Sequence, residues 1–161
     1  MWDKLTASLH DLTALYRVML EVSRKKKQAL IAAEVAELEQ LVKQEEALIL
    51  QIGACEKART KLIGELANAC GLPADELTLT KAKALSGSAA VKLEAAETEL
   101  TAVIAELAPL NKTNAELIRQ SLNYVNFNLN ILTQTVADPN YAAKGGDQSA
   151  PRSKSLIDAK I

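Results

Sequence analysis

The chain has 161 residues, enough for one domain that buries its own core without disulfide or metal support. Hydrophobic residues make up 48% of it, yet with one Trp, one Phe and three Tyr the core must be aliphatic, as in helical bundles. The formal net charge of −1 provides no overall field to attract nucleic acid or an anionic membrane, so a partner is expected to be recognised by shape and apolar contact.

The first predicted helix covers residues 3–27, with Asp3 as a plausible N-cap. The residues that recur at spacings of four and three, as in a coiled-coil seam, are Leu5, Leu9, Leu12, Tyr16 and Met19. The basic run 24–27 predicts the end of the helix, because cations in a last turn complement the helix dipole, and no aromatic residue interleaves them as in a nucleic-acid patch. A tight connection is expected over residues 30–34, although a continuous helix stays open because no Gly or Pro interrupts the segment.

The second predicted helix covers residues 35–70 and carries one heptad seam from end to end. The seam residues are Leu38, Leu41, Glu45, Leu48, Ile52, Cys55, Arg59, Leu62, Leu66 and Ala69. Glu45 and Arg59 are the only charges in this seam. Since such charges are unfavourable unless they are paired or lie near the edge, they are candidates for setting the register. Gly71, followed by Leu72 and Pro73, ends the helix.

A connector over residues 71–88 is predicted to contain one short helical turn, 80–85, before Ser88 caps the last helix, 89–136. The residues expected on the inner face of this last helix are Leu93, Leu100, Ile104 and Leu107. Pro109 then removes one backbone hydrogen bond, and with Asn111 and Asn114 it suggests a joint between a rigid lower half and a mobile upper half.

The predicted lengths of the last two long helices differ. At about 1.5 Å per residue, helix 35–70 spans roughly 54 Å and helix 89–136 roughly 72 Å. If the two run antiparallel, the last helix passes the end of its partner near Val125. Residues 125–136 would then be exposed, and an exposed apolar strip of that size usually marks a binding site.

Two apolar stripes follow this last helix when it is drawn at about 100° per residue. The stripe within about 40° of Ile118 has the character of an ordinary core face, and it comprises Ile118, Leu122, Val125, Leu129, Leu132 and Val136. The second stripe comprises Leu117, Tyr124, Phe127 and Ile131. It is explained either by another helix of the same bundle, above all for Leu117 and Tyr124, or by a docking surface for another protein.

Residues 138–161 are expected to form a disordered tail behind a helical-bundle domain of residues 1–137. Asp138-Pro139, Gly145-Gly146 and Pro151 break any periodicity there, and most of the residues are small or polar. The predicted fold is all-α: an antiparallel bundle of three long helices with coiled-coil-like seams, a short connector helix and this tail.

Motifs for catalysis, cofactors and metals are lacking in the sequence. His10 is the only histidine, its neighbours do not fit a phosphotransfer site, and one histidine cannot supply a di-iron bundle. Cys55 and Cys70 lack CxxC spacing, and no glycine-rich phosphate loop is present. With neither a signal-peptide core nor a membrane span, the chain is expected to be a cytoplasmic protein, without cofactor, that is not an enzyme.

The last helix and the tail resemble the FlgN family of flagellar export chaperones. The resemblance is carried by NAELIRQSLNYVNFNLNILT at 114–133, DPNYAAKG at 138–145 and SLIDAKI at 155–161. The segment 29–49, ALIAAEVAELEQLVKQEEALI, resembles the helical hairpin of the family, with Ala33-Glu34 where a Gly-Asp-like turn is more usual.

This resemblance implies a cytoplasmic chaperone that holds the hook-filament junction proteins FlgK and FlgL and delivers them to the type III export gate. Carried over by position, the client-binding residues are Ile118, Leu122, Val125, Asn126, Phe127, Leu129, Ile131 and Leu132. The tail tyrosine that docks on the gate protein FlhA is matched by Tyr141. The main alternative is a structural protein that buries the same surface in a homodimer. A more distant one, an enzyme or phosphorelay bundle, predicts that His10→Ala impairs function.

Overall fold

The computed structural model describes the backbone of residues 1–137 and the side chains of residues 1–133; the tail predicted to be disordered, 138–161, lies outside the described residues. All regular elements within this range are helical, which confirms the predicted all-α class. They are α1 (Trp2–Ala32), α2 (Val35–Ala69), the 3₁₀ turn Ala74–Glu76, α3 (Leu79–Leu85), the 3₁₀ turn Gly87–Ala89 and α4 (Ala90–Ala137).

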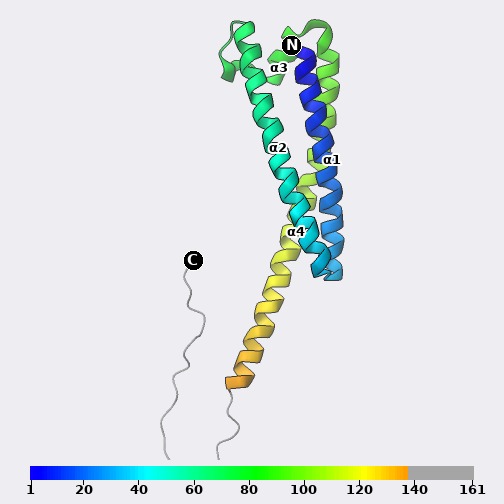
Figure 1. Cartoon of the computed structure of the whole chain (residues 1–161), viewed down its shortest axis with the longest axis vertical. Coiled ribbons are helices and arrows are strands. Elements are labelled where there is room, and N and C mark those ends of the chain that lie inside the picture. The colour runs from blue at the N-terminus through cyan, green and yellow to red at the C-terminus, as the bar shows by residue number, and fades with distance from the viewer. Residues whose placement is uncertain (138–161) are drawn as a thin grey trace, which may run out of the picture. The chain divides into compact units, whose positions relative to one another are not determined.

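The chain divides into two units, Met1–Asn123 and Tyr124–Ile161. In the first unit α1, α2 and the first part of α4 lie side by side, with α3 near the N-terminus (Figure 1). Because α1 and α2 are joined by only Ala33 and Glu34, they form an antiparallel hairpin. Ion pairs between α1 and α4, Asp3 with Lys92 at one end and Arg24 with Glu106 further along, show that these two helices run parallel.

The core of the first unit is aliphatic and follows the predicted seams. Leu5, Leu9, Leu12 and Met19 are buried, and Tyr16 packs against them half-buried. The buried α2 residues from the predicted seam are Leu41, Leu48, Ile52 and Leu66. On α4 the buried positions are Leu93, Ala96, Val103, Leu107 and Asn114. The prediction of Ile104 on the inner face was wrong: Ile104 is 40% exposed, and Val103 occupies that seam position.

The first helix is longer than predicted. It continues through the basic run to Ala32, so the prediction that it ends at Lys27 was wrong. The physical reason is tertiary: Lys26 is 8% exposed, and its Nζ donates to Glu45 Oε1 at 2.5 Å and to Oε2 at 2.6 Å. The start also differs slightly, since Asp3 lies in the first turn and not at the N-cap. Of the two predicted seam charges, Glu45 is thus paired with α1.

At the C-terminal end of each of the two hairpin helices, the chain turns through one residue with left-handed backbone angles. After α2, Gly71 has φ +69°, and the Leu72 amide donates to the Ala67 carbonyl at 2.9 Å, as in a Schellman motif. After α1, Ala33 has φ 56°, and the Glu34 amide donates to the Ala29 carbonyl at 3.0 Å. The predicted Gly71 stop is confirmed, and Ala33 holds the equivalent position without a glycine.

The connector contains the short helix expected there. It spans Leu79–Leu85, and the Thr78 hydroxyl caps it by accepting from the Lys81 amide at 3.3 Å. Lys83 donates to Glu97 Oε2 at 2.7 Å, and this hydrogen bond raises the pKa of Lys83. Ser88 lies inside the 3₁₀ turn Gly87–Ala89 and is not the N-cap of α4, which begins at Ala90.

Candidate functional site

A polar contact holds α4 against α1 just before the predicted site. Asn114 Nδ2 donates to the Ser23 carbonyl oxygen at 2.9 Å, and the Ser23 hydroxyl donates to Asn111 Oδ1 at 3.0 Å. Ser23 and Asn114 are 0% and 1% exposed. These asparagines therefore fasten α4 to α1 and do not loosen it, while α4 continues as one helix through the exposed Pro109. Asn114 is the last buried residue of α4 among the side chains described, which end at Thr133.

The part of α4 that follows Asn114 in the first unit contains two of the predicted site residues. Ile118 is 38% exposed and Leu122 is 57% exposed, so the interpretation of their stripe as an ordinary core face was wrong. The reason is register: Leu107 and Asn114 are buried seven residues apart, and this seam continues through the half-buried Leu117 to the exposed Ser121, so Ile118 and Leu122 lie beside it.

The second unit begins at Tyr124 and carries the other predicted site residues on α4. The two apolar stripes around this helix are both exposed: Val125 and Leu129 are 50% and 52% exposed, and Phe127 is 62% exposed on the opposite side. Asn126 is exposed as well, and so are Ile131 and Leu132. This segment therefore presents apolar surface in two directions, as the sequence predicted for residues 125–136; the side chains of 134–136 lie outside the described residues.

The exposed segment carries no charge. From Gln120 to Ala137 the sequence has no Asp, Glu, Lys or Arg, and its polar residues are Ser, Thr, Gln and Asn. Asparagines 123, 126, 128 and 130 alternate with the apolar residues. An uncharged surface of this kind suits recognition by apolar contact and neutral hydrogen bonds, and it offers nothing to bind phosphate or an anionic headgroup.

Tyr124 is a candidate site residue that the sequence reasoning did not select. It was placed on the second stripe, with contact to another helix as one explanation, and the structure leaves it 68% exposed. Its position on the same stripe as Phe127 was the signal that could have identified it. Aromatic residues are enriched in binding hot spots, so Tyr124 joins the candidate site. Tyr141, the predicted gate-docking residue, lies outside the described residues.

The rest of the described chain lacks features of a catalytic or metal centre. His10 is exposed on α1, with Nδ1 at 3.5 Å from Glu99 Oε2. Within residues 1–137 no group of three His, Cys, Asp or Glu side chains could hold a metal ion. In the same part of the chain, no helix has the length and apolarity needed to span a membrane.

Comparison with known proteins identifies the family of the chain. The family described as FlgN protein matches residues 1–149, which is nearly the whole chain. No curated protein matches significantly, and neither does any solved structure. The match covers all four helices, the candidate surface and Tyr141. The chain belongs to the FlgN family of flagellar export chaperones.

Proposed function

We propose that this protein is a cytoplasmic chaperone that binds the hook-filament junction proteins FlgK and FlgL through the end of α4 and delivers them to the export gate protein FlhA. Family membership supports the general role. The observation that carries the client site is the exposure of Tyr124, Val125, Phe127 and Leu129, all at least half exposed on the part of α4 that has no charged residue.

The binding mode that fits this surface is helix in groove. An amphipathic segment of the client would cover the apolar side chains of α4, and both partners would be shielded from water until export. Covering four half-exposed side chains would contribute roughly 3–6 kcal/mol before the ordering of the client is subtracted. The neighbouring asparagines would supply neutral hydrogen bonds that set the position of the client. No nucleotide is required.

A pair of substitutions tests the client site. Val125→Asp with Phe127→Asp places one charge on each apolar stripe, and it should weaken binding of a FlgK or FlgL C-terminal segment at least about 100-fold, because unpaired carboxylates would be buried against the client. Stability should change by less than about 0.5 kcal/mol per exposed site. The matched control is Val91→Asp, which alters an exposed aliphatic residue at the start of the same helix.

Two outcomes would contradict the client site. If the double variant loses several kcal/mol of stability, its residues belong to a core; if it binds the client as tightly as Val91→Asp, the surface is elsewhere. Light scattering over a range of concentrations separates the homodimer alternative. That alternative predicts a dimer that persists when the client segment is added, whereas the chaperone proposal predicts a complex of chaperone and client.

The gate-docking role of Tyr141 rests on the family likeness of DPNYAAKG. An aromatic anchor at an interface typically contributes about 2 kcal/mol or more. Tyr141→Ala should therefore leave client affinity intact and weaken binding to the cytoplasmic domain of FlhA roughly 30-fold, the equivalent of that energy. Equal gate binding by the variant and the parent in a titration would rule this role out.

A further inference from the structure

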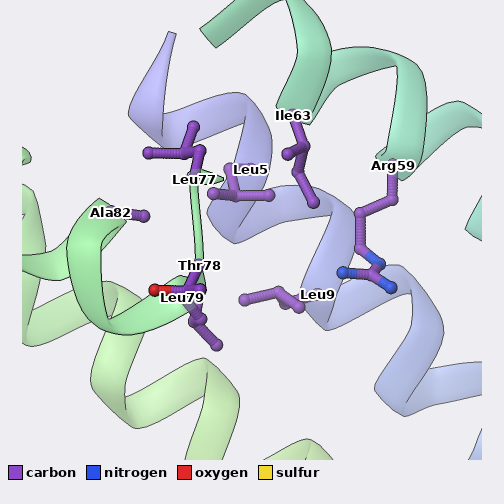
Figure 2. A pocket seen from close by; sticks show the side chains of 8 residues that line it. All are labelled: Leu5, Leu9, Arg59, Ile63, Leu77, Thr78, Leu79 and Ala82. Atoms are coloured by element: carbon purple, nitrogen blue, oxygen red, sulfur yellow. The ribbon is translucent and has the colours of Figure 1, made fainter. Parts of the chain in front are cut away.

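A separate cavity of about 230 Å³ lies in the first unit, where α1, α2 and the connector meet. Its lining residues are Leu5, Leu9, Arg59, Ile63, Leu77, Thr78, Leu79 and Ala82. Figure 2 shows the aliphatic side chains around a common space, with Arg59 extending from α2 at one side of it. The volume is below the roughly 300–1,000 Å³ of pockets for drug-sized ligands, so it suits a group of about one amino-acid side chain.

Arg59 is the one charged residue among those that line the cavity. Position 59 continues the series of buried or half-buried residues that includes Ile52, Cys55 and Leu62, where a leucine would fill the space between the helices. Arg59 is paired with Glu56 of the same helix, since its Nε and Nη2 donate to Glu56 Oε2 at 2.9 and 2.5 Å.

Hydrogen-bonding capacity remains at this cavity. Arg59 Nη1 makes no hydrogen bond to any residue in the described range, and its side chain is 30% exposed. The Thr78 hydroxyl accepts from the Lys81 amide but donates to no described residue. An aliphatic lining beside the Nη1 edge of a guanidinium suits a branched aliphatic group next to a carboxylate.

We propose that this cavity is a second binding site, which takes a branched aliphatic group carrying a carboxylate, with Arg59 Nη1 donating to the carboxylate and the aliphatic group among Leu9, Ile63 and Leu79. Two sources share this chemistry: a leucine-like residue at the end of a peptide and a free branched short-chain acid. The residues that line the cavity lie between Leu5 and Ala82, and none of them belongs to the client surface, so its test is independent of that surface.

Methyl NMR of the full chain provides the test, with Ile63 and Leu79 as reporters. The probes are N-acetyl-leucine, its neutral analogue N-acetyl-leucinamide, and 4-methylpentanoate. N-acetyl-leucine should shift both methyl signals with millimolar affinity, and the amide should bind about tenfold more weakly, because a charge-assisted hydrogen bond is lost.

Variants sharpen the assignment. Arg59→Gln should reduce N-acetyl-leucine binding to the level of the amide, and Arg59→Leu should abolish binding of both by filling the cavity. Arg17→Gln is the control, since Arg17 is ion-paired with Glu99 away from the cavity. Tighter binding of N-acetyl-leucine than of 4-methylpentanoate assigns the peptide source, and the reverse assigns the free acid. Equal binding of acid and amide, unchanged binding in Arg59→Gln, or no shift with any probe would overturn the proposal.

Discussion

At the scale of single residues, Ala33 is the most unusual backbone position of the hairpin. Its φ of 56° lies in the left-handed region, which a side chain with Cβ disfavours by about 1–2 kcal/mol. The equivalent position after α2 is Gly71, at φ +69°. The same turn is therefore made once with glycine and once without it.

This comparison predicts that Ala33→Gly stabilises the protein by about 0.5–1 kcal/mol, because relief of the left-handed strain exceeds the extra chain entropy of glycine in the unfolded state. Urea denaturation measures the difference. Gly71→Ala is the matched control and should destabilise by a similar amount. A less stable Ala33→Gly variant would show that the turn is not strained.

A second prediction at the residue scale concerns the ion pair of Lys26 and Glu45, whose side chains are only 10% and 18% exposed. Glu45→Leu leaves a buried ammonium without its partner and should cost about 3 kcal/mol of stability. Lys26→Met combined with Glu45→Leu removes both charges and should recover most of that loss. Additive losses in the double variant would mean that the two side chains do not act as a pair.

At the scale of elements, the burial of side chains on α4 changes after Asn114. Before that residue the helix supplies buried seam positions, and after it every described side chain is exposed or half-buried. The asparagines of residues 123–130 also have low helix propensity. Up to Thr133, the part of α4 after Asn114 therefore buries less side-chain surface than the part before it.

Hydrogen exchange of the free protein should reflect this change. Amides from Leu117 to Thr133 should exchange markedly faster than those from Leu38 to Leu66, since local opening there exposes little buried surface. Comparable protection in both segments would contradict it, and would require a stabilising contact for the end of α4 in the free protein.

The sequence predicts much at this scale because seams and stops are local signals. The buried residues from Leu5 to Met19 and from Leu41 to Leu66 follow heptad spacing, and a glycine at position 71 indicates the end of α2. The end of α1 could not be predicted in this way, because the charge of Lys26 is neutralised by a residue on another helix. The burial of Val103 in place of Ile104 could not be predicted either. Both residues are aliphatic, and only the packing of the partner helices decides which of them is buried.

The candidate site was accessible to sequence reasoning for a different reason. Comparison of helix lengths predicted exposure from Val125 onward, and this does not depend on side-chain detail. The helix lengths could not predict whether Ile118, Leu122 and Tyr124 are exposed, because their exposure depends on where the buried seam of α4 ends.

At the scale of the whole molecule, the two units differ in how much core they contain. Both core clusters lie in Met1–Asn123, whereas the described side chains of the second unit contribute to neither. Changes to the end of α4 are therefore expected to act on binding and not on stability. The cavity beside Arg59 lies in the first unit.

The most direct test of the client surface is hydrogen exchange of the full chain with and without a FlgK C-terminal segment. The proposed function predicts new protection of amides between Ile118 and Thr133, little change in α1 and α2, and loss of this protection in the Val125→Asp, Phe127→Asp variant. New protection confined to α1 and α2, or none at saturating client, would contradict it.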